Sequence, residues 1–358
     1  MDIQQRIDLI KEVGEEILTE EELKTLLETK KKPIAYDGFE PSGHAHIAQG
    51  ILRAINVNKM IKAGCTFKMY AADWHGWTNM KFGGDLEKIQ TAGDYLIEVW
   101  KASGMDVDQV EFIRAIDLID NQDYWKKVIR IAQHSTVNRI IRCGQIMGRK
   151  EAEVQQASQI IYPCMQAADI FELEADITQL GMDQRKVNIL ARELGPKLGY
   201  WKPVVVSHHM LQGLGKPASE EQDATERAID MKMSKSKPET AIFMTDTEED
   251  VTRKINNAYC PAGQLKDNPL AEYLRYIIFE KNKTITIERD KKFGGDITFE
   301  DYQTFATTYQ ENKIHPLDVK KTVALYINKL LDPVRKHFTT NNKAKQLLEQ
   351  VKSFQITR

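Results

Sequence analysis

Residues 1–32 carry charged side chains around a recurring set of apolar ones, which is typical of amphipathic helices. The apolar positions of the first predicted helix share a helical spacing: Leu9, Ile10, Val13 and Ile17. Thr19 and Glu22 occupy the N-cap and N3 positions of a capping box and predict a second, short helix. This helix ends in the lysines that precede Pro33.

Beyond Pro33, short apolar runs alternate with helical segments. The apolar run at residues 34–36 is followed by a predicted helix at 51–63, a turn at Gly64 and a second apolar run at 66–72. Further strand candidates are residues 110–113 and 204–207. This succession is typical of a parallel α/β sheet, whose ligands bind at the carboxyl ends of the strands.

Beyond about residue 245 the sequence pattern changes to charged helical segments. The predicted helices cover residues 248–259, 269–279 and 317–336, with a two-stranded insert around 284–288. Such a segment does not easily extend a parallel sheet. The predicted fold class is therefore α/β, with a Rossmann-like parallel-sheet domain at residues 1–245 and a mainly helical C-terminal domain at 246–358.

Composition describes an ordinary globular protein with a sizeable core. The 358 residues are 42% hydrophobic and 28% charged, with a formal net charge of -2. This balance argues against a surface coated with positive charge for indiscriminate nucleic-acid binding, but it allows local basic patches. The four cysteines stand far apart without Cys-x-x-Cys spacing, as expected of free thiols in a reducing compartment. Neither a signal peptide nor a membrane span is recognisable, so we expect a cytoplasmic protein.

The first candidate for chemistry is the segment Met-Lys-Met-Ser-Lys-Ser-Lys at residues 231–237. It gathers three lysines and two serine hydroxyls in seven residues. Such a cluster can neutralise and hydrogen-bond a polyphosphate. A solvated loop is the alternative interpretation, so a second motif is needed.

That second motif is Pro-Ser-Gly-His-Ala-His-Ile-Ala-Gln-Gly at residues 41–50. It lies where a strand passes into a helix, and its small residues allow the backbone to approach a ligand closely. Helix N-termini offer N–H groups to phosphate. His44 and His46 form a weak candidate for zinc, because no cysteine or third histidine stands at ligand spacing. We therefore expect no protein-bound metal.

Tyr162, Gln166 and Asp169 share one face of the helix expected to follow Pro163, because they are spaced i, i+4, i+7. They span roughly 10 Å along the helix, comparable to an amino acid with a large side chain. The carboxylate at one end, with a phenol and an amide at the other, fits a zwitterion that carries a hydroxyl. A solvated polar stripe is the alternative, but the surrounding apolar residues favour burial.

The segment Leu-Gly-Met-Asp-Gln-Arg-Lys at residues 180–186 adds further candidates. Asp183 can accept hydrogen bonds from a ribose, and Gln184 can bind an amine or a carboxylate. Arg185 and Lys186 suit the end of a nucleic acid. A solvated turn before a helix remains an alternative.

Together these motifs resemble a known family. The segments at 41–50 and 231–237 are similar to the two signatures of class I aminoacyl-tRNA synthetases. Tyr36, Tyr162-Pro-Cys-Met-Gln-Ala-Ala-Asp169 and the segment at 180–186 are similar to tyrosyl-tRNA synthetases of the archaeal and eukaryotic type. The resemblance runs from about residue 31 to 337. It implies a class I catalytic domain with an inserted connective region, followed by an anticodon-binding domain.

The resemblance implies that L-tyrosine is activated with ATP and transferred to tRNA(Tyr). It implies contacts with the phenolic hydroxyl of tyrosine from Tyr36 and Asp169. The α-amino group would be held by Tyr162, Gln166 and Gln184.

The resemblance also implies a set of ATP contacts. His46 would stabilise the phosphates, and Lys232 and Lys235 would bind the departing pyrophosphate. Asp183 would contact the ribose. The remaining implied ATP contacts are Gly43, Gln49, Met210 and Leu211, the last two beside adenine. Mg²⁺ would accompany ATP.

Contacts with tRNA are implied at two places. The acceptor end would meet four cations: Arg139, Arg142, Arg185 and Lys186. An anticodon base would be stacked by Phe293 and His315 and hydrogen-bonded by Asp318. Judged from the residues alone, Phe293 reads as a core residue and His315 as a helix-entry residue.

The chain departs from the family's pattern at Ala48 and Gln49, where many class I enzymes have Gly and His, so the role of Gln49 is open. Three alternatives also remain: a tryptophan-specific sister enzyme, a nucleotidyltransferase of the same superfamily, and a non-catalytic RNA-binding paralogue. The family implies a homodimer that joins around residues 105–125.

Overall fold

The computed structural model describes residues 1–147, 156–217, 231, 233 and 237–354. Its main sheet has six strands in the order β1-β6-β5-β2-β3-β4. The strands are β1 (Gly14–Leu18), β2 (Ile34–Phe39), β3 (Thr66–Ala71), β4 (Val110–Arg114), β5 (Ile177–Thr178) and β6 (Val204–His208). All neighbours pair in parallel except β1, which runs antiparallel to β6. The predicted α/β class is confirmed.

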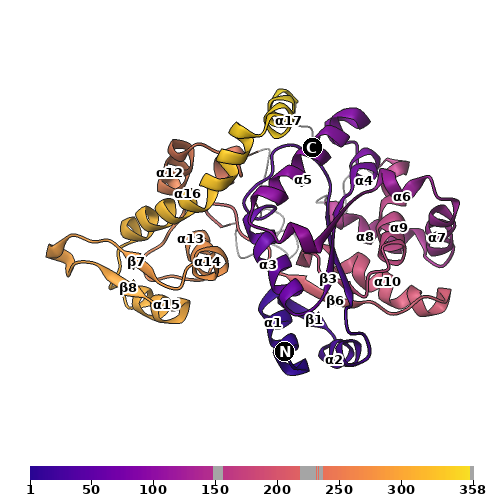
Figure 1. Cartoon of the computed structure of the whole chain (residues 1–358), viewed down its shortest axis with the longest axis horizontal. Helices are drawn as coiled ribbons and strands as arrows, with labels where there is room; N and C mark the ends of the chain where they lie inside the picture. Colours follow the sequence, from indigo (N-terminus) through magenta and orange to yellow (C-terminus); the bar gives the residue numbers. More distant parts are fainter. Residues whose placement is uncertain (148–155, 218–230, 232, 234–236, 355–358) are drawn as a thin grey trace.

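Helices cover both faces of this sheet (Figure 1). One group comprises α1 (Ile3–Val13), α3 (Ile51–Lys62) and α5 (Leu86–Ala102). The other comprises α7 (Gln122–Gln133), α8 (Val137–Cys143), α9 (Ala157–Glu172) and α10 (Arg185–Leu198). Three short helices connect these layers: α2 (Glu20–Thr29), α4 (Asp73–Thr78) and α6 (Ile116–Ile119). Each group buries its apolar side chains in its own core cluster.

The C-terminal region is helical, as predicted, with a small hairpin. Its helices are α12 (Glu248–Asn257), α13 (Pro269–Tyr273), α14 (Phe279–Lys281), α15 (Tyr302–Gln310), α16 (Pro316–Thr340) and α17 (Asn342–Ser353). A π-helical turn at Leu274–Ile278 joins α13 to α14, and β7 (Ile285–Ile287) pairs with β8 (Ile297–Phe299). The core cluster beneath α1, α3 and α5 continues into these helices. The boundary at 245/246 stays a prediction.

Two sequence expectations about helix limits are wrong. Ile17 does not extend the first helix: α1 ends at Val13, and Ile17 lies in β1, paired with Val206 of β6. Tertiary pairing overrides the helical spacing here. The helix that carries Asp169 begins at Ala157, so Pro163 lies inside it rather than before it. The capping box of Thr19 and Glu22 is confirmed, with hydrogen bonds of 3.2 Å in both directions.

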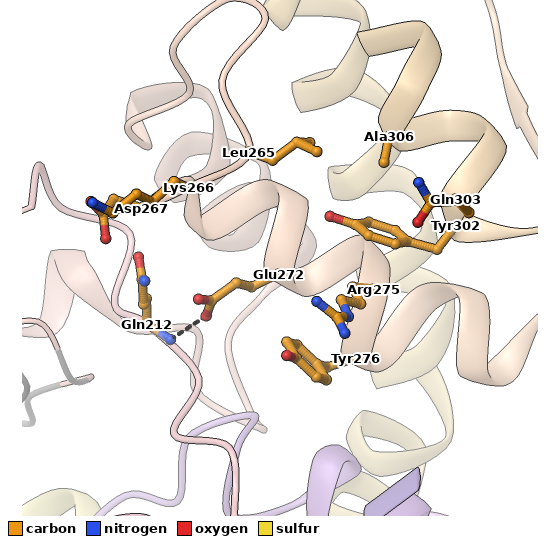
Figure 2. Close-up of a pocket in the computed structure, with 10 residues that line it drawn as sticks. All are labelled: Gln212, Leu265, Lys266, Asp267, Glu272, Arg275, Tyr276, Tyr302, Gln303 and Ala306. Carbon is orange, nitrogen blue, oxygen red and sulfur yellow. Dashed lines mark hydrogen bonds between the residues drawn. The ribbon is translucent and has the colours of Figure 1, made fainter. Parts of the chain in front are cut away.

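His209 joins the sheet to the C-terminal helices immediately after β6. Its Nδ1 lies 3.2 Å from Oε2 of Glu15 in β1, and its Nε2 lies 3.2 Å from Oε2 of Glu272 in α13. Its ring stacks on Tyr276 at 4.4 Å. Figure 2 shows Glu272 also accepting a hydrogen bond from the Gln212 backbone N–H at 2.9 Å, beside an open cavity of about 390 Å³.

Burial lowers the pKa of His209, but hydrogen bonds from its ring to Glu15 and Glu272 outweigh this and raise it to about 9. A histidine in the unfolded chain titrates at about 6.5. The stabilisation from this junction is therefore complete below pH ~6.5 and is lost as the pH rises through the folded-state value.

We predict that His209→Gln lowers Tm at neutral pH, and that the deficit relative to wild type shrinks as the pH rises through about 9. Thermal unfolding of both proteins across this range measures the effect. His134→Gln is the control, because the His134 ring contacts the Arg130 carbonyl of its own helix. A deficit that does not change with pH would contradict the protonated junction.

Candidate functional site

Asp169 is the centre of a buried polar cluster on the α9 face of the sheet. Its Oδ1 accepts hydrogen bonds from the hydroxyls of Tyr70 at 3.2 Å and Tyr124 at 3.0 Å. Its Oδ2 lies 2.9 Å from Nε2 of His75. The Asp169 side chain is 2% exposed. This burial confirms that the polar face of the helix is buried, as the sequence favoured, and is not a solvated stripe.

The charge of Asp169 shifts the pKa values of neighbouring side chains, among them Tyr36 and His75. Burial raises the pKa of the Tyr36 hydroxyl well above its usual range, and the charges of Asp169 and Asp37 raise it further. Burial alone would lower the pKa of His75, but the charge of Asp169 and the hydrogen bond to it raise it overall. A protonated His75 would balance the buried carboxylate.

The Tyr36 hydroxyl is buried and has no hydrogen-bond partner among the described residues. Leaving such a group unsatisfied costs about 1–3 kcal/mol. The charge of Asp169 acts on it directly. Tyr36 and Asp169 are therefore placed to receive a ligand that carries its own hydroxyl.

Gln166 of α9 meets Gln184, which lies in the short turn before α10. Gln166 donates from Nε2 to Oε1 of Gln184 at 3.0 Å, and Gln184 donates to the Ile146 carbonyl at 3.1 Å. Oε1 of Gln166 is buried without a partner among the described residues. Burial raises the pKa of Tyr162 well above its usual range, and the charge of Glu40 raises it further. An acceptor oxygen, a phenol and a nearby carboxylate suit an ammonium group.

Several residues of this cluster were missed from the sequence: Glu40, Tyr70, His75 and Tyr124. Glu40, Tyr70 and His75 lie at or just beyond the ends of predicted strands, where ligand-binding residues are expected. Tyr124 lies on α7 and has no local signal in the sequence. Only the fold brings it to Asp169.

The segment at 41–50 lies beside the chain that follows the lysine-serine segment. His46 forms a β-bridge with Phe243, the Ile47 N–H donates to the Ile242 carbonyl at 2.8 Å, and the Met244 N–H donates to the Ala45 carbonyl at 2.9 Å. Gly43 adopts φ 105°, which favours glycine. Lys232 and Lys235 lie outside the described residues.

Gln49 makes hydrogen bonds within the protein through both its side chain and its backbone. Its Oε1 accepts the His46 N–H at 3.3 Å, and its carbonyl accepts the Trp100 indole N–H at 2.9 Å. It is 9% exposed. The side chain therefore holds the backbone of His46.

The candidate nucleotide residues meet around Gly181. A Cβ at Gly181 would lie 2.5 Å from Sδ of Met210, 2.6 Å from Oδ1 of Asp183 and 3.4 Å from Nε2 of His208. A side chain at position 181 would therefore displace the ends of the Met210 and Asp183 side chains. Leu211, the other residue implied at adenine, is 3% exposed.

A second buried charge network lies on the α3 face. Arg53 donates from Nη1 to Asp37 at 2.5 Å and to Gln179 at 3.1 Å, and lies 3.2 Å from Nδ1 of His208. Burial raises the pKa of Asp37 to about 6 despite the opposing charge of Arg53. Burial and the Arg53 charge lower the pKa of His208 well below its usual range. Because Nδ1 faces a donor, the neutral His208 carries its proton on Nε2.

Three of the cations implied at the acceptor end, Arg139, Arg142 and Lys186, lie close enough to Cys143 for their charges to oppose the rise that burial causes in its pKa. Most of the four have partners. Arg185 donates to Glu16 at 2.7 Å, Arg139 lies 2.7 Å from Glu193, and Lys186 donates to Gln145. Arg142 lies exposed on α8. These pairs would have to be exchanged for phosphates on binding.

The residues implied at the anticodon flank one end of the C-terminal region. Phe293 is 64% exposed, so the core interpretation is wrong. Nδ1 of His315 accepts the Leu317 N–H at 3.2 Å, and Asp318 follows in the first turn of α16. Arg289 joins the two loops by donating to the carbonyls of Gly295 and Lys313.

Among the described residues, no group of three or more His, Cys, Asp or Glu side chains gathers as a metal site requires. No helix in the described part of the chain is both long and apolar enough to span a membrane.

Comparison with known proteins shows the family of the chain. A family model described as "tRNA synthetases class I (W and Y)" matches residues 28–332. The chain therefore belongs to the class I tRNA synthetases of the tryptophan and tyrosine group.

Several similar relatives are named as tyrosine enzymes. "Tyrosine--tRNA ligase 1, cytoplasmic" of Arabidopsis thaliana is 49% identical, and the match covers 100% of this chain and 90% of that protein. The tyrosyl-tRNA synthetase of Pyrococcus horikoshii, solved with L-tyrosine, matches at a TM-score of 0.91 and 38% identity, covering 98% of this chain and 100% of that one. The Leishmania major enzyme, solved with tyrosinol, matches at 0.89 and 43% identity, but this chain spans 61% of its length while 99% of this chain is covered.

The unpaired Tyr36 hydroxyl yields a stability prediction. Tyr124→Phe removes a hydrogen bond to the Asp169 carboxylate and should lower the free energy of unfolding by about 1–3 kcal/mol. Tyr36→Phe removes a buried hydroxyl without a partner among the described residues and should leave that free energy unchanged or higher. Denaturant unfolding of the ligand-free variants measures both. A loss in Tyr36→Phe as large as in Tyr124→Phe would refute the unpaired hydroxyl.

Proposed function

We propose that this protein is a tyrosine-tRNA ligase, which activates L-tyrosine with ATP and transfers it to the 3′ end of tRNA(Tyr). The observation that carries the proposal is the buried Tyr36 hydroxyl without a described partner, in the field of Asp169. A phenol fills this position and satisfies both groups. Relatives named as tyrosine ligases over the full chain support the same substrate.

In this proposal Tyr36 and Asp169 bind the substrate hydroxyl, and the opposite end of the pocket binds the α-amino group. Tyr162, Gln166 and Gln184 form that end. The acceptor Oε1 of Gln166, which has no described partner, suits an ammonium N–H. The order of Tyr162, Gln166 and Asp169 along α9 matches a zwitterion with its side chain toward Asp169.

Activation joins two anions, so placement and charge stabilisation dominate it. The tyrosine carboxylate is already ionised and attacks the α-phosphorus of ATP without a general base. A new P–O bond forms as the bond to pyrophosphate breaks. We assign His46 to the phosphates and Lys232 and Lys235 to the departing pyrophosphate. Asp183, Met210 and Leu211 would hold the nucleoside near Gly43 and Gln49, and Mg²⁺ would arrive with ATP.

Transfer follows when a hydroxyl of the terminal tRNA ribose attacks the adenylate carbonyl and AMP leaves. Acceptor-end contacts are assigned to Arg139, Arg142, Arg185 and Lys186. The exposed ring of Phe293 supports anticodon stacking with His315, because unpaired bases are usually read by stacking and edge contacts. A homodimer that joins around residues 105–125, in the cytoplasm, completes the proposal.

Each alternative function leaves one feature of the structure without a role. A tryptophan-specific enzyme has no substrate hydroxyl to pair with Tyr36. A nucleotidyltransferase without tRNA would not need the exposed Phe293, and an RNA-binding paralogue would not need a buried amino-acid pocket. ATP–pyrophosphate exchange across the twenty amino acids, followed by charging of total tRNA, distinguishes all of them. Exchange with tryptophan instead of tyrosine, or with no amino acid, overturns the proposal.

We predict that Asp169→Ala strongly erodes selectivity for tyrosine over phenylalanine, and Tyr36→Phe less so. A site built to pair with a hydroxyl leaves buried groups unsatisfied by phenylalanine; tyrosyl-tRNA synthetase is itself the reference case, with discrimination on the order of 10⁴–10⁵. Amino-acid-dependent pyrophosphate exchange with both substrates gives the ratio of kcat/KM. Unchanged selectivity in both variants would remove these residues from the pocket.

We predict that Asp318→Ala raises KM for tRNA roughly tenfold, because one charge-assisted hydrogen bond is lost. Adenylate formation should not change. Glu349→Ala, an exposed carboxylate on α17, is the matched control. If Asp318→Ala charges wild-type and anticodon-altered tRNA as before, with the same KM, Asp318 does not read the anticodon.

A further inference from the structure

Lys254 is a buried cation outside the residues assigned to the substrates. It projects from α12, and its side chain is 4% exposed. Its Nζ lies 2.6 Å from Oδ2 of Asp246 and donates to the Ala241 carbonyl at 3.0 Å. It also lies 4.7 Å from the centroid of the Phe243 ring. Lysine is almost never buried without such partners.

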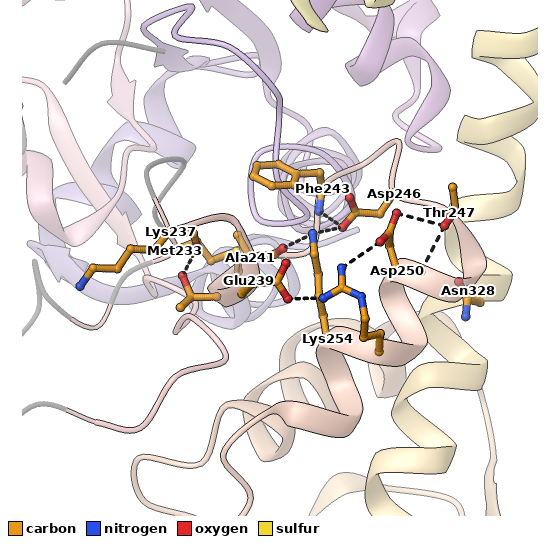
Figure 3. A network of polar contacts seen from close by, with 12 residues as sticks. Met233, Lys237, Glu239, Ala241, Phe243, Asp246, Thr247, Asp250, Lys254 and Asn328 are labelled. Carbon is orange, nitrogen blue, oxygen red and sulfur yellow. Dashed lines mark hydrogen bonds and ion pairs between the residues drawn. The ribbon is translucent and has the colours of Figure 1, made fainter. Parts of the chain in front are cut away.

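The partners of Lys254 all belong to one short segment, residues 241–246 (Figure 3). The oxygen of Asp246 that meets Lys254 also accepts the Phe243 N–H at 2.9 Å. Ala241, Ile242, Phe243 and Met244 are all buried. One ammonium group therefore fixes both ends of the segment.

This segment contacts the first signature along its backbone. Ile242 and Met244 exchange hydrogen bonds of 2.8 and 2.9 Å with residues on either side of His46. Met244 also fills the space above Gly50, where a Cβ would lie 2.4 Å from its Sδ. The position of the His46 backbone therefore depends on the segment.

The same segment continues the second signature. Residue 241 follows Lys237 by only four positions, and Thr240 is held by its N–H to the Lys237 carbonyl at 2.9 Å and by its own carbonyl, which accepts the Leu214 N–H at 2.8 Å. Upstream, Met233 is 6% exposed, and its Sδ lies 3.9 Å from the Tyr273 hydroxyl of α13. Lys254 thus holds the C-terminal end of the lysine-serine segment against the first signature.

The helix that carries Lys254 is itself fixed to the C-terminal region. Asn328 of α16 donates to the Glu248 carbonyl at the start of α12 at 3.3 Å. Arg335 of α16 donates to the Asp246 carbonyl at 2.8 Å. The side chain and the backbone of Asp246 are therefore held from two C-terminal helices.

We propose that Lys254 is a positioning residue for the activation step, which holds the two ATP signatures in one frame by fixing residues 241–246. This inference rests on the proposed function. Lys254 touches no substrate in it, and it acts through the backbone of His46 and the end of the lysine-serine segment. A displacement of about 1 Å in such a frame can lower a rate roughly 100-fold. The tyrosine pocket lies on the α9 face and does not depend on it.

The test is Lys254→Met, with the neighbouring Arg253→Met as matched control. Arg253 lies on the same helix, but its partners Glu239 and Asp250 are exposed, and its side chain is 47% exposed. For Lys254→Met we expect kcat of tyrosine-dependent pyrophosphate exchange to fall roughly 10–100-fold. The dissociation constant for tyrosine, measured by equilibrium dialysis below the Tm of each variant, should stay within about twofold. Arg253→Met should keep both quantities.

The outcomes separate this inference from the proposed function. A wild-type protein without tyrosine-dependent exchange overturns the proposed function. Exchange in the wild type with kcat unchanged in Lys254→Met overturns the positioning role. Loss of tyrosine binding together with kcat also overturns it, because the effect would then be general. If Lys254→Met does not fold, Asp246→Asn must give the same split between kcat and tyrosine binding, and equal kcat there overturns the inference.

Discussion

The buried carboxylate of Asp169 is the interaction on which the rest of the pocket depends. A carboxylate removed from water must be surrounded by donors or a balancing charge. Here the donors come from β3, the short helix α4 and α7, through Tyr70, His75 and Tyr124. The requirement therefore fixes α9 against three separate elements. The same three donors leave the Tyr36 hydroxyl without a described partner.

The same carboxylate links folding to selectivity. Donors that satisfy Asp169 stabilise the empty pocket, while the unmatched hydroxyl of Tyr36 leaves one hydrogen-bonding position for a substrate. A phenylalanine ring would fill the volume but leave that position unsatisfied, whereas a phenol completes it. In the proposed function, selectivity for tyrosine comes from this incomplete polar network rather than from pocket volume.

Local spacing in the sequence identifies site residues that share one helix, but not their partners from other elements. The i, i+4, i+7 pattern placed Asp169 beside Gln166, because those residues share a helix. Tyr124 and His75 come from other elements, and no spacing relates them to Asp169. Ile17 was misplaced because its helical spacing continues into a strand that only pairing with β6 defines. The two-residue β5 is too short to give a periodic signal. In the sequence, nothing distinguishes Lys254 from an exposed charge on an amphipathic helix, although its side chain is only 4% exposed.

The alternation of β2 explains how one strand contributes to two separate polar networks. Tyr36 points to the α9 face and joins the core cluster there, while Ala35 belongs to the cluster on the α3 face. Asp37 also points to the α3 face, where it meets Arg53 of the helix that follows the first signature. Successive side chains of a strand must point to opposite faces, so a slip of one residue would exchange the two roles. Pairing of β2 with β3 over six consecutive residues, Ile34 to Phe39, fixes this register. The candidate tyrosine pocket and the candidate nucleotide side are thus set apart by the pleat of a single strand, so that each polar network can be changed on its own face of the sheet.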